Sequence, residues 1–171
     1  MAKALDIIRN EHRSIAAVLD NLRRLVRGGR VPRIAPEVFG AMVNYLESFA
    51  DIVHHPKEDR YLFAVLRRHG AEPENLIAEL EREHADGERA LRGLKQSYAR
   101  LEAEGDKGLP AFSGAVERFA QAYYEHMRKE EEQVFPLAER LFTPVEWAAI
   151  DRAFEENRDP VANGDLDFTD R

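Results

Sequence analysis

Apolar residues recur at steps of three and four along most of the chain, which is the spacing that one face of an α-helix requires. Four long stretches have this spacing, at about residues 4–27, 36–69, 73–104 and 110–141. Glycine or proline stands at the junctions, at Gly28, Gly29, Pro32, Pro36, Gly70, Pro73, Gly105, Gly108 and Pro110. No stretch shows the alternation of a strand, and long helices with short connections are typical of antiparallel bundles. The pattern therefore predicts an all-α fold, an up-down antiparallel four-helix bundle.

A shorter element is predicted towards the C-terminal end. Thr143-Pro144-x-Glu146 resembles a capped helix start, so we expect a short fifth helix that ends near Glu156. From residue 159 to residue 171 the sequence is acidic and has no helical period. We therefore predict one bundle domain over residues 1–158 and a disordered acidic tail over residues 159–171.

Composition and charge narrow the classes of function. The chain has 171 residues, of which 44% are apolar and 33% charged, and its net charge is −7. A nucleic-acid surface would need a basic patch, so we expect no nucleic-acid partner. No apolar run approaches the ~20 residues that span a bilayer and no signal-peptide core is seen, so we expect no membrane contact and a cytoplasmic location. Because the chain has no cysteine, any metal must be held by nitrogen and oxygen.

The histidines repeat at a fixed distance along the chain. A shift of 72 residues relates four pairs, which are His12 and His84, His54 and His126, Glu58 and Glu130, and Phe63 and Phe135. The chain therefore reads as two copies of a helix hairpin. In each copy the first helix supplies a histidine and the second helix supplies His-x-x-x-Glu.

The His-x-x-x-Glu spacing indicates a metal site. Residues four apart on a helix lie on one face, with Cβ atoms ~5–6 Å apart. Two such hairpins in one bundle bring four imidazoles and two carboxylates into a shared interior, a mixture that suits iron, manganese or zinc. Six ligands are too many for one tetrahedral zinc. The simplest assignment has two bridging carboxylates and four terminal imidazoles, which are Glu58, Glu130, His12, His54, His84 and His126.

These motifs resemble the hemerythrin-like (HHE cation-binding) domain family over about residues 5–141. The matching elements are His12, His54-x-x-x-Glu58 followed by Phe63, Glu83-His84, and His126-x-x-x-Glu130 followed by Phe135-Pro136. The resemblance implies a four-helix bundle that holds two iron ions, with an oxo or hydroxo group as a further bridge. It also implies O2, peroxide or NO as the small ligand, in sensing, scavenging or a stress response.

Two positions depart from the oxygen-carrying hemerythrins. Those proteins have His-x-x-x-His on the third helix, where this chain has His84-x-x-x-Glu88. They have His-x-x-x-x-Asp on the fourth, where His126-x-x-x-Glu130 is the nearest match and Glu131 occupies the fifth step. Glu88 and Glu131 are therefore further candidate ligands. We expect a centre richer in carboxylate and poorer in histidine, which favours oxidation, peroxide handling or sensing over reversible oxygen carriage.

Neighbours of the motif residues allow two interpretations each. We expect His55 beside the ligands or at the surface, with a ligand role as the alternative if Pro56 kinks the helix and turns the ring inward. Glu11 and Glu83 are expected to face solvent, or else to orient an imidazole. Tyr123 is expected to pack in the core, or else to donate a hydrogen bond to a bound oxygen species.

Other classes of function stay open at this point. A ferritin-like di-iron oxidase would have Glu-x-x-His on two helices, and Glu81-x-x-His84 is the one match. A metal-dependent helical interaction module would use its metal to report the iron level to a protein partner. A zinc-filled site would keep the fold without redox chemistry. No residue resembles a substrate-specific acid or base, so the sequence leaves enzymatic turnover undecided.

Overall fold

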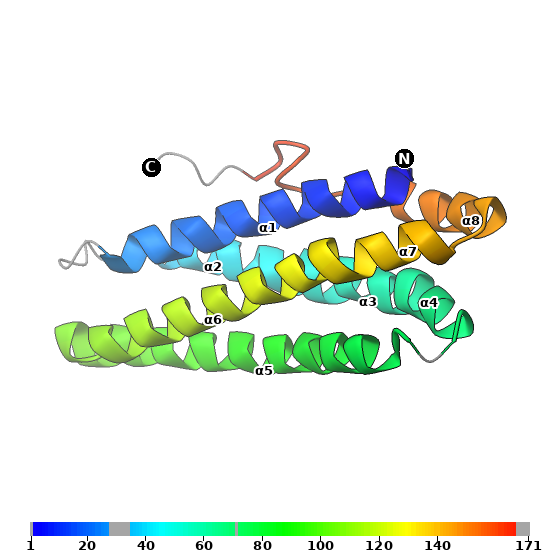
Figure 1. Ribbon diagram of the computed structural model, residues 1–171. Coiled ribbons are helices and arrows are strands. Elements are labelled where there is room, and N and C mark those ends of the chain that lie inside the picture. Colours follow the sequence, from blue (N-terminus) through cyan, green and yellow to red (C-terminus); the bar gives the residue numbers. More distant parts are fainter. Residues whose placement is uncertain (1, 28–34, 71, 167–171) are drawn as a thin grey trace.

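Figure 1 shows the computed structural model of the chain, which describes residues 2–27, 35–70 and 72–166. Over these ranges the chain is helical and contains no strand, so the predicted all-α class is confirmed. The junction that we predicted at Gly28, Gly29 and Pro32 lies outside the described residues.

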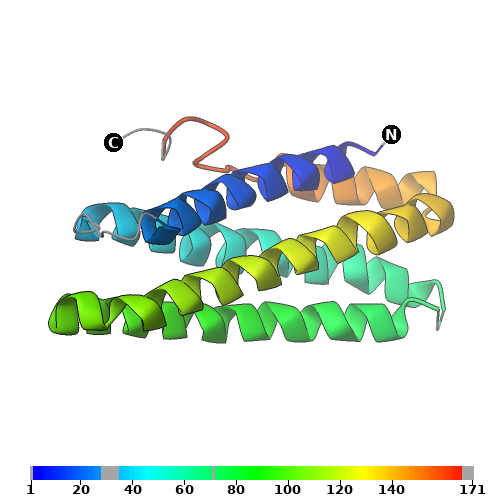
Figure 2. The same cartoon turned by 60° about the vertical axis from the view of Figure 1, so that its left-hand side comes forward.

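Four helical rods run antiparallel in chain order, as Figures 1 and 2 show. The first rod is α1, Lys3–Arg27, and the third rod is α5, Glu74–Glu104. The second rod joins three α-helical parts through two π-helical segments, in the order α2 (Pro36–Tyr45), Leu46–His54, α3 (His55–Lys57), Glu58–Phe63 and α4 (Ala64–Arg68).

The fourth rod has one such interruption. It follows a 3₁₀ turn, Gly105–Lys107, and consists of α6 (Leu109–Lys129), the π-helical segment Glu130–Val134 and α7 (Phe135–Leu141). A short helix, α8 (Pro144–Glu155), then packs across the ends of α1 and α7 in Figure 1. Four rods and a short C-terminal helix are the predicted architecture.

Local sequence explains where these elements begin and end. The Thr143 hydroxyl accepts a hydrogen bond from the backbone N–H of Glu146 at 3.3 Å, and the Glu146 carboxylate accepts one from the backbone N–H of Thr143 at 2.9 Å. This reciprocal pair is a capping box and starts α8 where the sequence predicts. Gly105, with φ of 62°, ends α5, and a side chain there would be strained.

The π-helical segments coincide with the motif residues. His54 ends one segment, Glu58 begins the next, and Glu130 begins the third. A π-helical turn holds more residues than an α-helical turn, so it changes which side chains face the interior. Pro56 lies in the first turn of α3, between two of these segments. The helix around Pro56 therefore departs from a regular α-helix through π-helical turns.

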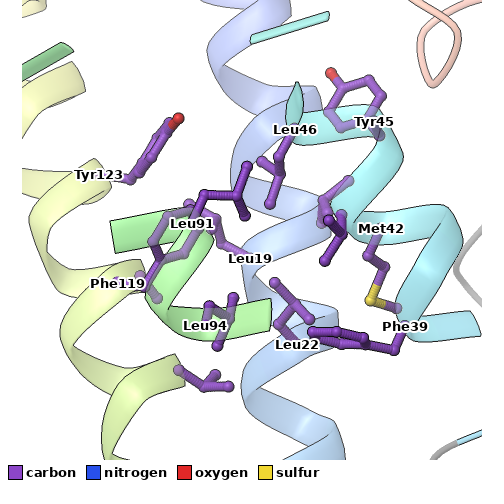
Figure 3. Packing of buried hydrophobic residues seen from close by; sticks show 14 of the residues in the cluster. Leu19, Leu22, Phe39, Met42, Tyr45, Leu46, Leu91, Leu94, Phe119 and Tyr123 are labelled. Atoms are coloured by element: carbon purple, nitrogen blue, oxygen red, sulfur yellow. The ribbon is translucent and has the colours of Figure 1, made fainter. Parts of the chain in front are cut away.

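The apolar core of the bundle consists of two clusters. Between them lies a layer of buried polar side chains, which we call the polar layer and which contains Glu11, His12, His54, His55, Glu58, His84, His126 and Glu130. The larger cluster joins all four rods and includes Leu19, Met42, Leu91 and Phe119, which Figure 3 shows in the shared interior between the rods. The other cluster joins the opposite ends of the rods to α8 and includes Phe154. Among the described helices, none combines the length and the apolar character that crossing a bilayer requires.

The chain beyond α8 returns along α1, as both views show. Asp159 is buried, and its carboxylate accepts a hydrogen bond from the Tyr45 hydroxyl at 3.1 Å. Val161 and Leu166 pack against the larger apolar cluster. We expected a disordered tail from residue 159, but residues 159–166 lie on the bundle, because these buried contacts offset their polar composition. Residues 167–171 lie outside the described part of the chain.

Candidate metal centre

The polar layer gathers the predicted ligands from all four rods. None of the six residues of our assignment is more than 6% exposed, although all are polar or charged. The layer also contains two buried side chains that the assignment left out, His55 and Glu11. Because charged side chains are rarely buried without a partner, the contacts inside this layer decide what it binds.

The imidazoles form two groups. His12 and His54 lie together with ring centroids 5.1 Å apart, and we call this pair the first half of the layer. His55, His84 and His126 lie together, and we call these three the second half. In the second half, Nε2 of His84 and Nε2 of His126 are 3.0 Å apart. Two nitrogens held at right angles about 2.1 Å from one ion lie about 3 Å apart, so this pair has the spacing of two ligands of one cation.

Glu58 is fully buried between the two halves and directs one oxygen to each of them. Its Oε1 atom lies 3.4 Å from Nε2 of His54, and its Oε2 atom lies 3.7 Å from Nε2 of His84. A single carboxylate therefore faces both imidazole groups.

Glu130 repeats this arrangement from the fourth rod. Its Oε2 atom lies 3.2 Å from Nε2 of His12, and its Oε1 atom lies 3.3 Å from Nε2 of His126. All four carboxylate oxygens of Glu58 and Glu130, and Nε2 of His12, are buried without a hydrogen-bond partner. Buried polar atoms without a partner are strongly destabilising, and a cation among them would satisfy them. The residues present therefore fit a bound metal ion.

An outer set of carboxylates orients the imidazoles. In each of four histidines Nδ1 donates a hydrogen bond to a carboxylate, so that Nε2 is directed at the buried glutamates and is the nitrogen that a metal would take. The four bonds are His12 to Glu131 at 2.8 Å, His54 to Glu11 at 2.7 Å, His84 to Asp59 at 3.0 Å and His126 to Glu83 at 2.9 Å. Once the proton on Nε2 is lost, each ring is the neutral imidazole, with hydrogen on Nδ1, that binds metals.

The carboxylates in and around the layer favour positive charge on the imidazoles. Burial lowers the pKa of His84, but its interactions with Asp59 and Glu130 outweigh burial and raise the pKa to about 10. Burial is likewise outweighed at His126, where Glu130 and Glu83 raise the pKa to about 9. Without a metal ion these imidazoles hold protons, so a cation that binds them must displace protons.

Two phenylalanines cover the imidazoles. The ring of Phe135 lies parallel to that of His12 with centroids 6.2 Å apart, and the ring of Phe63 lies parallel to that of His84 at 5.8 Å. Both phenylalanines are fully buried. They belong to the smaller apolar cluster, so the polar layer borders apolar side chains at this end.

His55 lies closer to the centre than we expected. Its ring is buried and stacks on that of His84 with centroids 4.1 Å apart. Potential ligand atoms of His55, Glu58, His84 and His126 all lie within 4.8 Å of one another. The π-helical segments on both sides of α3 explain this inward position, because they rotate residue 55 relative to a regular α-helix. Burial, together with the neighbouring imidazoles, lowers the pKa of His55 well below its ordinary value, so the ring is neutral.

The other candidate residues take different places. Glu88 is exposed and belongs to neither group of potential ligands, and Glu131 bonds to the Nδ1 side of His12. With His55, the potential ligand groups contain five imidazoles, one more than our assignment. For both Glu11 and Glu83 the alternative to a solvent-facing place was to orient an imidazole, and both do so. Glu11, which is 2% exposed, accepts from His54, and Glu83 accepts from His126.

A pocket of about 220 Å³ leads from the surface to the second half of the layer. His55, His84 and His126 lie at its base, and Gly87 and Tyr123 line its wall. Tyr123 both packs in the larger apolar cluster and donates a hydrogen bond from its hydroxyl to the Asp51 carboxylate at 3.0 Å.

A four-rod helical bundle with imidazoles and carboxylates gathered in one buried layer defines a class of cation-binding helical protein. The hemerythrin HHE cation binding domain matches residues 3–138, which include every residue of the layer. The chain therefore belongs to the hemerythrin HHE family. No curated protein and no solved structure matches the chain.

Proposed function

We propose that the layer holds two iron ions and that the protein binds or reacts with O2, peroxide or NO at an open iron position. Its role would be sensing, scavenging or a stress response. One observation carries the proposal, namely that Glu58 and Glu130 each face both imidazole groups with one oxygen apiece. A single ion would leave half of these buried oxygens without a partner.

Each group of residues has a distinct part in this assignment. His12 and His54 would hold one ion, and His84 and His126, with His55 beside them, would hold the other. Glu58 and Glu130 would bridge. Five imidazoles and two shared carboxylates exceed what four-coordinate zinc uses and suit iron. When bound, a ferrous pair supplies the two electrons that reduce a small oxidant.

The chain's own residues would prepare the site for that chemistry. The outer carboxylates keep hydrogen on Nδ1, so that the imidazoles present Nε2 without reorganisation. Phe63 and Phe135 exclude water from the imidazoles that they cover. A fixed, dry donor set of this kind favours a defined coordination geometry.

The alternatives have less support. A ferritin-like oxidase would need Glu81 at the centre, but the Glu81 carboxylate forms an ion pair with the Arg67 guanidinium. A helical interaction module would need an apolar face, and the large apolar side chains exposed in the described residues are Ile52 and Val145, on different elements.

The test is metal content together with the absorption spectrum under anaerobic reduction and re-exposure to air. We expect about two irons per chain and charge-transfer bands that bleach on reduction and return with oxygen. A colourless protein that holds zinc, or no metal after anaerobic loading with ferrous iron, would contradict the proposal.

A further inference from the structure

The two halves of the polar layer differ in how many ligand positions they would fill. In the second half His55, His84 and His126 supply three imidazoles, and Glu58 and Glu130 each direct one oxygen to that half. With the bridging oxo or hydroxo group, these donors complete the six positions of an octahedral ion. The first half has two imidazoles, so the open iron position of the proposed function lies there. The second half, once loaded, has no position for a small ligand.

A pocket nevertheless connects the second half with solvent. Its volume is about 220 Å³, and its base is formed by all three imidazoles of that half. A divalent cation carries about six waters of ~30 Å³ each, so the hydrated ion takes up roughly 180 Å³. The pocket is therefore large enough for a hydrated cation, and it ends at the side chains that would replace the water of that cation.

The 72-residue shift shows which side chains are missing at the pocket. It pairs Ile15 with Gly87 and Val18 with Ala90. The two aliphatic residues are fully buried, whereas their counterparts line the pocket. A Cβ atom at Gly87 would lie 3.6 Å from Cε2 of Tyr123, an ordinary contact, and the φ angle of Gly87 is not in the left-handed region. Small residues at these two positions therefore leave the second half open, and the helix geometry does not require them.

The lining of the pocket is acidic. Glu83, Asp86 and Glu125 contribute three carboxylates, and the described lining contains no lysine or arginine. Basic side chains pair with the first two carboxylates, whereas Glu125 accepts a hydrogen bond from the neutral side-chain amide of Gln121. A cleft lined by one sign of charge concentrates ions of the opposite sign and raises their association rate. The lining therefore favours the approach of a cation and opposes that of an anion.

We propose that this pocket is the route by which the metal ion of the second half enters and leaves. The second half then exchanges its ion with solvent faster than the first half, where Ile15 and Val18 fill the equivalent space. The inference rests on the proposed function in naming iron as that ion and in counting one ion for each half. It assigns the pocket to metal exchange and leaves the small ligand to the first half.

The first test narrows the route. Gly87→Ile copies Ile15, and isoleucine has a higher helix propensity than glycine, so α5 should remain folded. Fully zinc-loaded protein should lose its metal to a chelator in two steps of about one ion each. The variant should slow the faster step by about tenfold and leave the affinity in chelator competition unchanged, because a narrowed route hinders entry and exit alike.

Two further variants accompany this test. Gly93→Ile is the matched control, because Gly93 is exposed on the same helix with no atom near its Cβ position. Ala90→Ile adds bulk at an exposed position of the lining and should also slow the faster step. Release from both pocket variants at the rate of the control would overturn the proposal. A change in affinity as large as the change in rate would overturn it too, because it would reveal a disturbed ligand and not a narrowed route.

A second test assigns the faster step to a half. His54→Ala removes an imidazole of the first half, so the ion that this variant keeps lies in the second half. That ion should leave at the rate of the faster step, and adding Gly87→Ile should slow its release. Release at the rate of the slower step would contradict exchange through the pocket.

A third test addresses charge. Glu125→Gln should slow the association of zinc with the metal-free protein by about threefold at low salt, and the difference should shrink as salt is added. Glu139→Gln is the control, because Glu139 is exposed on α7 and is not part of the lining. Equal association rates in the two variants would overturn the part given to the acidic lining.

Zinc makes these tests independent of redox chemistry. Slower zinc release from Gly87→Ile, in a protein that never forms charge-transfer bands with iron, would reject the proposed function and keep the route. A redox-active iron pair whose release ignores Gly87→Ile would keep the function and reject the route.

Discussion

In the first half of the polar layer the His12 ring lies parallel to Phe135, and in the second half the His84 ring lies parallel to Phe63, with interplanar angles of 12° and 11°. The paired histidines make similar angles as well, 74° between His12 and His54 and 65° between His84 and His126. Every one of these contacts follows the 72-residue shift. The inner geometry of the two hairpins is therefore nearly the same.

The surroundings of the two halves differ. In the first half Glu11 is buried and accepts a second hydrogen bond from the side-chain amide of Asn157 at 2.6 Å. Its counterpart Glu83 is 29% exposed and pairs with Lys129. Asn157 lies outside the matched family region, residues 3–138, so the cover of the first half comes from beyond that domain. The repeat thus fixes where a cation would be held, and residues that depart from the repeat determine how each half meets solvent.

The largest expected effect comes from removing a residue that both halves share. Glu58→Ala should remove both metal ions, because each half loses one buried oxygen, whereas His54→Ala should remove the ion of the first half and leave about one per chain. Elemental analysis of purified protein measures this directly. Glu81→Ala, which removes a carboxylate paired with Arg67, should leave the metal content unchanged. Loss of both ions in His54→Ala to the same extent as in Glu58→Ala would contradict the division into halves.

A smaller effect is expected from the outer carboxylates. Glu11→Gln and Glu83→Gln should each weaken metal binding by about 10–100-fold, because the imidazole behind each loses its charged acceptor. The loss should be larger for Glu11→Gln, since Glu11 is buried and water cannot replace it. Competition with a chelator gives both affinities. Glu79→Gln is the control, because Glu79 pairs with Lys129 and contacts no imidazole in the described contacts. Equal losses in all three variants would show that surface charge, and not orientation, is responsible.

Much of the fold follows from the sequence because helix signals are local. The steps of three and four, the capping residues around Thr143 and the glycine at position 105 each act within one turn, and the structure places helix ends there. Local signals of this kind cannot predict that residues 159–166 lie on the bundle. The order of this segment depends on Tyr45, which lies far away along the chain and meets Asp159 only in the folded bundle.

The candidate site likewise has residues that the spacing predicts and residues that it does not. The repeat revealed the residues that face the centre, because four-residue steps on a helix share one face. The sequence favours His55 beside the ligands or at the surface, because a regular α-helix cannot present both His54 and His55 to the same centre. The π-helical segments that bring its ring into the layer cannot be predicted from spacing. The charged neighbours Glu11 and Glu83 were open to either interpretation. Each immediately precedes a motif histidine, and that shared position was the available signal.

A pH effect should distinguish the metal-free protein from the loaded one. The pKa values of His84 and His126, about 10 and about 9, lie above the ordinary 6.5. Bound protons therefore stabilise the metal-free fold fully below the ordinary pKa, and this stabilisation is lost as the pH rises through 9 to 10. The melting temperature of the metal-free protein should fall between about pH 7 and pH 10, and that of the loaded protein should fall less, because metal has replaced the protons. His126→Ala should flatten the metal-free profile in part. A flat profile in the unmodified metal-free protein would contradict the raised pKa values.

The smallest effect concerns the segment that returns along α1. Tyr45→Phe removes the hydroxyl that donates to the buried Asp159 carboxylate, and we expect the free energy of unfolding to fall by about 1 kcal/mol. Urea denaturation of the metal-loaded protein measures it. Tyr124→Phe is matched in chemistry, because the Tyr124 hydroxyl donates to Asp20 at 2.6 Å on the surface, where water can replace it, and its cost should be close to zero. Equal costs in the two variants would mean that this contact of the segment adds no more than a surface hydrogen bond.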